Sequence, residues 1–105
     1  QTMGNFNIAS VSQMGDSNIA SATQAIGNSN DIMIDQTGNS NTGTAIQMLG
    51  SDNMISLSQD GSMNTATNMQ MGSDHMATIS QSGGNHSHMG MQTGTGNTLT
   101  VTQSN

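Results

Sequence analysis

The sequence predicts an all-β fold, a β-solenoid of two stacked parallel sheets with nine strands in about four and a half turns. Three observations predict it. All glutamines fall on one series with steps of 11 or 12 residues, each step carries a glycine in the same phase, and alternating residues separate each asparagine from the next glutamine. The glutamines are Gln1, Gln13, Gln24, Gln36, Gln47, Gln59, Gln70, Gln81, Gln92 and Gln103.

Leu, Ile, Val and Phe supply only 14 of the 105 residues, a composition that taken alone is typical of disorder. Disordered chains, however, do not keep Gly, Asn and Gln in fixed phase. The apolar residues are therefore few but occupy fixed positions in the repeat. Residues 1–105 are expected to form one repeat domain.

The strands are predicted from the five residues that separate each Asn-position residue from the next Gln, because their alternation has the period of two that a strand requires. Each predicted strand has seven residues and is about 23 Å long. The predicted strands are 7–13, 18–24, 30–36, 41–47, 53–59, 64–70, 75–81, 86–92 and 97–103.

The links between these strands are short and contain the repeated glycine, which can take a positive φ in a tight arc. A link of four or five residues leaves room for a β-arc and none for a helix. The arc glycines are Gly15, Gly27, Gly38, Gly50, Gly61, Gly72, Gly83 and Gly94, with Gly4 in the same phase at the start of the chain.

The middle residues of the strands predict how the two sheets pack. Odd strands carry bulky pairs such as Ile32/Ile34 and even strands carry slim pairs such as Gly43/Ala45, so large meets small across a thin core. Two steps sum to 23 or 22 residues, which places one strand in each sheet per turn. Strands of one sheet then stack in parallel and in register, about 4.7 to 4.8 Å apart.

Inward Asn and Gln are predicted to form ladders in which each amide bonds the equivalent amide one turn above and below. This explains why the polar rows are amides, since a stacked carboxylate or ammonium would meet its own charge every turn. The Gln ladder runs from Gln13 to Gln103. The Asn ladder comprises Asn7, Asn18, Asn30, Asn41, Asn53, Asn64 and Asn97, with His75 and His86 in the same phase.

Residues 13–24, with the sequence Gln-Met-Gly-Asp-Ser-Asn-Ile-Ala-Ser-Ala-Thr-Gln, resemble the curlin repeat of the curli subunits, the extracellular functional amyloid of bacterial biofilms. That repeat has a Gln followed by x-Gly-x-x-Asn-x-Ala and a second Gln. Residues 36–47 and 59–70 resemble it closely too. The chain departs from the family in having His75 and His86 at Asn positions, no basic residue and Phe6 as its only aromatic.

The resemblance implies a secreted structural subunit of an extracellular cell-surface fibre that serves biofilm matrix and adhesion. It implies three partners: other copies of the chain, a related nucleator subunit and an outer-membrane secretion channel.

Charge excludes other partners. The chain has no Lys or Arg and a formal charge of −6, so neither nucleic-acid binding through phosphates nor attraction to an anionic membrane is expected. It has no Cys and no apolar run long enough to insert into a membrane. The sequence has no cationic segment before an apolar stretch at its start. We therefore expect it to be mature or trimmed material.

The predicted end strands lack the residues that protect sheet edges. There is no Pro, Lys or Arg, and residues 7–13 and 97–103 contain no charge. We therefore expect head-to-tail assembly into a cross-β fibril. The aspartates are expected in arcs or on an outward face: Asp16, Asp52, Asp60 and Asp74 in arcs, and Asp31 and Asp35 on the third strand.

No catalytic site and no cofactor are expected. Asp31 and Asp35 are about 13 Å apart along one strand, too far for a carboxylate pair, and no base stands near the Ser and Thr hydroxyls. The chain is therefore not expected to be an enzyme. His75, His86 and His88 could bind copper or zinc, but their inward positions favour hydrogen-bonding roles.

Six methionines are predicted to project outward and to fill gaps between neighbouring filaments: Met33, Met54, Met69, Met76, Met89 and Met91. Copper or redox chemistry is the alternative role for them. An alternative function for the whole chain is an ice-binding β-solenoid with a flat Thr-rich face, supported by Thr42/Thr44, Thr65/Thr67 and Thr98/Thr100/Thr102. Met, Ser and Asp at the equivalent positions of neighbouring turns interrupt that face.

Overall fold

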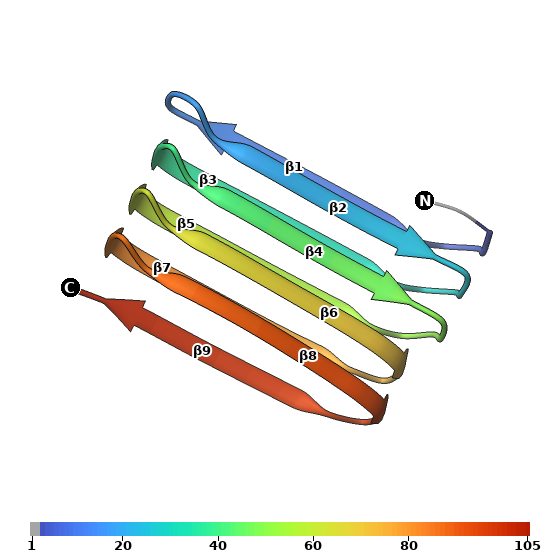
Figure 1. Ribbon diagram of the computed structural model, residues 1–105. Helices are drawn as coiled ribbons and strands as arrows, with labels where there is room; N and C mark the ends of the chain where they lie inside the picture. Colours follow the sequence, from blue (N-terminus) through green and yellow to red (C-terminus); the bar gives the residue numbers. More distant parts are fainter. Residues whose placement is uncertain (1–2) are drawn as a thin grey trace.

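The computed structural model describes residues 3–105 as a flattened coil of nine strands joined by tight arcs (Figure 1). None of the described residues forms a helix long and apolar enough to cross a membrane. The strands are β1 (Ile8–Met14), β2 (Ile19–Ala25), β3 (Asp31–Asn39), β4 (Thr42–Met48), β5 (Met54–Ser62), β6 (Thr65–Ser73), β7 (Met76–Gly84), β8 (Ser87–Thr95) and β9 (Thr98–Ser104).

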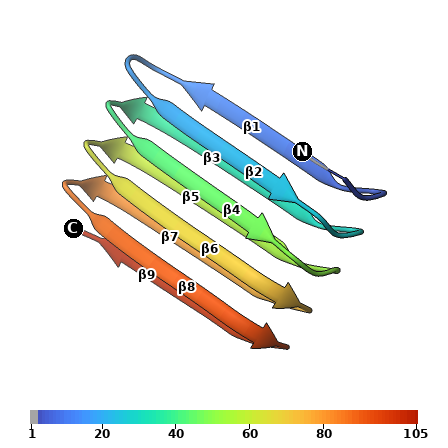
Figure 2. The same cartoon turned by 45° about the vertical axis from the view of Figure 1, so that its right-hand side comes forward.

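The strands alternate between two sheets, so the predicted two-sheet β-solenoid is confirmed. The odd strands form a sheet of order β1-β3-β5-β7-β9 and the even strands one of order β2-β4-β6-β8. The two sheets lie face to face, with consecutive strands running in opposite directions on the two sides of the coil (Figure 2). All pairs within a sheet are parallel and in register, as Gln36 opposite Gln59 illustrates.

The strand bounds differ from those predicted. Every strand begins one residue later and ends one to three residues later than its predicted range. The Asn position belongs to the arc because the residue before it has a positive φ. Its carbonyl nevertheless supports the neighbouring strand, as when the Ile8 N–H donates to the Asn30 oxygen at 2.8 Å.

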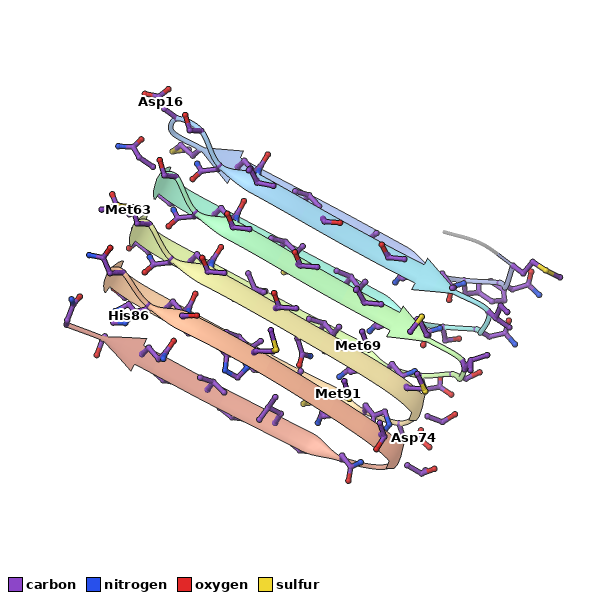
Figure 3. The ribbon with its side chains drawn as sticks, viewed as in Figure 1. Asp16, Met63, Met69, Asp74, His86 and Met91 are labelled. Carbon is purple, nitrogen blue, oxygen red and sulfur yellow. The ribbon has the colours of Figure 1, made fainter. Side chains whose placement is uncertain are left out.

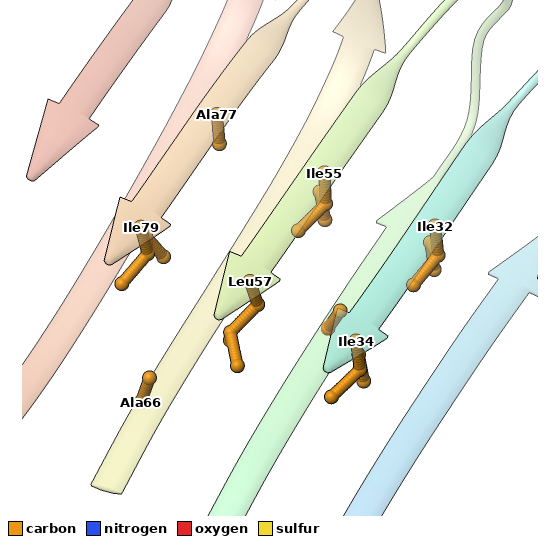
Figure 4. Close-up of a cluster of buried hydrophobic side chains, with 8 residues drawn as sticks. Ile32, Ile34, Ile55, Leu57, Ala66, Ala77 and Ile79 are labelled. Atoms are coloured by element: carbon orange, nitrogen blue, oxygen red, sulfur yellow. The ribbon is translucent and has the colours of Figure 1, made fainter. Parts of the chain in front are cut away.

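The core lies between the sheets and has the expected bulky and slim sides. Ile32, Ile34, Ile55, Leu57 and Ile79 of the odd strands are at most 1% exposed (Figure 4). They face small residues of the even strands, chiefly Ala45 and Ala66. The fit is close, because a Cβ added at Gly43 would lie 3.1 Å from a Leu57 methyl carbon. Large and small side chains therefore fill the core without a third layer.

Each arc has at least two residues in the left-handed region, of which the sequence indicated one. The repeated glycine has φ between 101° and 144° at eight of nine positions, and in the three longer arcs the residue before it, Met3, Ile26 or Leu49, also has a positive φ. A second left-handed position directly precedes the Asn position and accepts Asp, Asn or Ser, the residues that tolerate this conformation best. Its occupants are Phe6, Ser17, Ser29, Ser40, Asp52, Met63, Asp74, Asn85 and Gly96.

The repeated glycines are required by close stacking as well as by φ. A Cβ added at Gly61 would lie 1.9 Å from the Gly83 carbonyl oxygen, and one added at Gly38 would lie 1.9 Å from that of Gly61. Even Gly27, for which no left-handed φ is recorded, would collide with the Gly50 carbonyl oxygen at 1.7 Å. Each arc thus rests directly on the backbone of the next.

Gly61→Ala is expected to lower the free energy of unfolding by several kcal/mol, because it combines backbone strain with a collision against a carbonyl that cannot move aside. The matched control is Gly96→Ala, where φ is +71° and no atom lies within 4 Å of the added Cβ. It should cost only about 1 to 2 kcal/mol. Urea unfolding followed by circular dichroism measures both, and equal losses would show that stacking of the arcs is unimportant.

Candidate functional site

The glutamines form two continuous rows of side-chain hydrogen bonds along the coil axis. In the odd sheet, Gln13 donates to Gln36 at 2.7 Å and Gln36 to Gln59 at 2.7 Å, and the row continues through Gln81 to Gln103. In the even sheet the row Gln24, Gln47, Gln70, Gln92 has distances of 3.1, 3.1 and 2.8 Å. Gln1 lies outside the described residues. Six of these glutamines are at most 1% exposed, so the rows run inside the protein.

Each glutamine from Gln24 onward also makes a bond across the core, which the sequence did not reveal. Its amide nitrogen donates to the carbonyl of the first residue of the preceding strand, in the opposite sheet. Gln36 of β3 bonds the Ile19 oxygen of β2 at 2.9 Å, and Gln59 of β5 bonds the Thr42 oxygen of β4 at 3.0 Å. The same bond recurs from Gln24 through Gln103. From Gln24 to Gln81, the side-chain amide therefore donates twice, once along the coil axis and once between the sheets.

The asparagines differ from the prediction of an amide-to-amide ladder. Asn41 donates to the Gly61 carbonyl at 2.9 Å, and its own oxygen accepts the Asn64 backbone N–H at 3.1 Å. Asn7, Asn18, Asn30, Asn53 and Asn64 repeat the bond to an arc glycine. Asn53 also bonds Asn30 amide to amide, at 3.0 Å. Because Asn is one methylene shorter than Gln and lies in the arc, the backbone of the next turn is its nearer partner.

Asn97 completes this position on the last turn, where its amide donates to the Thr93 carbonyl at 2.7 Å. His75 and His86 take the place of Asn in two turns. The backbone N–H of His75 donates to Asn53 Oδ1 at 3.0 Å. The ring Nδ1 of His75 accepts the backbone N–H of Asn97 at 3.2 Å, as an asparagine oxygen does in other turns. The His86 Nε2 lies 2.9 Å from the Ser82 carbonyl oxygen. These contacts support structural roles for both imidazoles.

The third histidine lies in the one region where core polar groups lack partners. Among residues 3–105, both amide atoms of Asn68 and the Nε2 of His88 are buried without a hydrogen bond. Gly90, one turn above Asn68, leaves the space between them: a Cβ there would lie 2.7 Å from Asn68 Oδ1 and 2.9 Å from His88 Nε2. Ala22 and Ala45 occupy the same row on the earlier turns.

No metal site is apparent in the part of the chain that the structure describes, since three or more His, Cys, Asp or Glu side chains gather nowhere in it. The six expected methionines do occupy outward positions, and Met48 and Met71 join them because β4 and β6 extend past their glutamines. The expectation that Asp60 lies in an arc is wrong, since it is an outward residue of β5.

The threonines named for an ice-binding face are divided between the two sheets. Thr42 pairs with Thr65 and Thr44 with Thr67 on the outside of the even sheet. The next turn carries Ser87 and Met89 at these positions, so the block ends after two turns. The other group, from Thr98 to Thr102, lies on β9 of the odd sheet.

The first and last strands of each sheet expose complementary backbone edges. At each strand start inside the solenoid, an outward residue donates its N–H to the arc carbonyl of the following turn: Asp31 to Asn53 and Thr42 to Asn64, at 2.8 and 2.7 Å. Thr98 of β9 and Ser87 of β8 hold the equivalent positions, but no further strand follows within the described residues. The C-terminal end of the coil therefore offers the donors that the N-terminal end accepts.

Comparison with known families agrees with this arrangement. The model of a family described as the curlin associated repeat matches residues 27–61, 50–83 and 77–104. The matches together span residues 27–104, well over half of the chain. No curated protein matches the sequence.

The unpartnered amide leads to a stability prediction. Asn68→Ala is expected to raise the free energy of unfolding by about 1 kcal/mol, because two buried unsatisfied polar atoms outweigh the small cavity left behind. Gln70→Ala, its control on the same strand, breaks a satisfied row and should lower that free energy by about 2 kcal/mol or more. Urea unfolding measures both, and a comparable loss in Asn68→Ala would show that the Asn68 amide is paired.

Burial of His88 is expected to make the stability of the protein depend on pH. Desolvation lowers the pKa of His88 from its usual value of 6.5, so the folded state favours the neutral imidazole. The unfolded chain binds more protons as the pH falls through about 6.5, and the protein loses stability until the pH is below the lowered pKa. His88→Ala should remove this loss. Urea midpoints at about pH 8 and pH 5 test it, and equal pH dependence in both proteins would refute it.

Proposed function

Because the chain belongs to the curlin-repeat family, we propose that it is the structural subunit of an extracellular curli-like amyloid fibre. The family is structural rather than enzymatic. Membership of it implies that the chain assembles with its own copies into fibres outside the cell. We propose that the fibre contributes to the biofilm matrix and to adhesion. A related nucleator subunit and an outer-membrane secretion channel are the further partners that family membership implies.

The observation that carries the proposal is the repeated interface within the solenoid. Every turn meets the next through the same Gln bond and the same in-register strand pairing, and six asparagines add the same bond to an arc glycine. Addition of another copy to β8 and β9 would reuse the Gln bond and the strand pairing, because every strand of either sheet carries both. A heterologous contact of this sort does not close on itself and produces a filament. We accordingly assign the Gln and Asn rows and the arc glycines as the working residues.

Backbone polarity supports head-to-tail growth. At the strand starts, outward residues of one turn donate to inward residues of the next, so a parallel contact that keeps the core inside joins a C-terminal edge to an N-terminal edge. Two C-terminal edges could pair only antiparallel or with one sheet turned over, and neither arrangement continues the amide rows. Charge does not prevent the contact, since β1, β2, β8 and β9 contain no Asp. The resulting hydrogen bonds lie along the fibre axis, as in other cross-β assemblies.

The test uses Thr100→Pro. Thr100 is an outward residue of the edge strand β9, so its N–H faces the open side, where Pro is tolerated. The wild-type chain should assemble into fibres with a meridional reflection at about 4.7 to 4.8 Å. The variant should fold, add through its N-terminal end to a growing tip, and stop elongation there at substoichiometric amounts.

Dye binding and sedimentation follow the kinetics, with Thr100→Val as the control that keeps the N–H and should elongate normally. A wild-type chain that remains monomeric at high concentration, with or without seeds, would refute the proposed function. Wild-type fibres whose growth is unaffected by Thr100→Pro would refute growth through β9.

A further inference from the structure

The two outer surfaces of the solenoid differ in charge. The odd face consists of the outward residues of β1, β3, β5, β7 and β9, and it carries Asp31, Asp35 and Asp60. The even face consists of the outward residues of the other sheet and carries no charged side chain. Its residues are Ile19, Ser21, Thr23, Ala25, Thr42, Thr44, Ile46, Met48, Thr65, Thr67, Met69, Met71, Ser87, Met89, Met91 and Thr93.

Five methionines form a continuous diagonal ridge on the even face. Met48 lies beside Met71 and Met69 beside Met91 in register on adjacent strands, while Met89 stands two residues from Met91 along β8. Met69 and Met91 are labelled in Figure 3 on neighbouring ribbons of this face. Met89 is 83% and Met91 68% exposed, so the solenoid leaves this apolar ridge in water. Thioether side chains are flexible and adapt to an opposing surface.

We propose that the even faces of two filaments pack against each other, so that the partner of this surface is a second copy of the chain in a neighbouring fibre. This inference rests on the proposed function, since it concerns assembled filaments. The facing sheets would be about 10 Å apart, with the methionine ridges interdigitating.

Charge selects this pairing over the two alternatives. Two odd faces would bring the Asp31, Asp35 and Asp60 carboxylates of each subunit against like charges. An odd face on an even face would remove those carboxylates from water against Met and Thr. The chain has no Lys or Arg to compensate a buried carboxylate, so both arrangements are costly. Pairing of even faces desolvates no charge.

The size of the face determines when pairing occurs. Four strands about 4.8 Å apart and about 23 Å long give a face of roughly 440 Å² per subunit. This is about half of the roughly 800 Å² per partner that a specific complex of ordinary stability buries. Single subunits are therefore not expected to dimerise. In a filament whose subunits keep their even sheets on the same side, the contact repeats in every subunit and its effect accumulates.

The experiment compares two matched double variants. Met69→Thr with Met91→Thr removes an in-register pair from the even face, and Met54→Thr with Met76→Thr removes an in-register pair from the odd face. Mass per length and cryo-electron microscopy count the filaments in each fibre. Wild-type and odd-face variant fibres should be mainly doublets, and the even-face variant should lower the doublet fraction at least tenfold.

Met91→Glu provides a second measurement, with Met76→Glu as its odd-face control. A single carboxylate on the even face should suffice to separate filaments, while added charge on the odd face should leave doublets intact. Wild-type fibres made of single filaments, or doublets reduced equally by both members of either variant pair, would overturn this inference and leave the proposed function standing. A wild-type chain that forms no filament would overturn the proposed function itself.

Discussion

The structure depends on one constraint, that each residue lies directly above its equivalent one turn away. Only residues that are compatible with their own copies fit such a column. Amides qualify because each carries a donor and an acceptor, and the Gln36–Gln59 bond of 2.7 Å illustrates the result. Glycine qualifies in the arcs because a Cβ at Gly61 would meet the next carbonyl at 1.9 Å. Charged residues do not qualify, and no Asp is buried among residues 3–105.

This constraint explains which features the sequence could predict. A column shows in the sequence as a period, so the Gln rows, the arc glycines and the two-sheet fold followed from spacing alone. The period carries no information about contacts between unlike columns. The bond from Gln36 to the Ile19 carbonyl, the Asn41 bond to Gly61 and the second left-handed residue of each arc depend on backbone geometry, and spacing did not reveal them.

The region around Asn68 shows what happens when a column is broken. Asn68 follows Ala22 and Ala45, so its amide has no equivalent above or below to bond. Gly90 provides the space, since a Cβ there would lie 2.7 Å from Asn68 Oδ1, and the neighbouring His88 nitrogen is left unpartnered too. The volume of the core is thus conserved while its hydrogen bonding is not. The break concerns β6 and β8, near one end of the even sheet.

A column of equivalent residues can also continue beyond the last turn of the coil, because each residue is compatible with a further copy of itself. In the proposed fibre, a contact between β9 and the next copy would use the same backbone and amide bonds as the contact between β5 and β7, so fibre growth would draw on the same free energy per turn as folding. Selectivity along the axis would then come from the parallel amide rows, which continue in only one orientation. Selectivity across the axis comes from side chains, because only there do charged and uncharged faces differ. The two directions of assembly can therefore be altered by separate substitutions, one at a strand edge and one on an outer face.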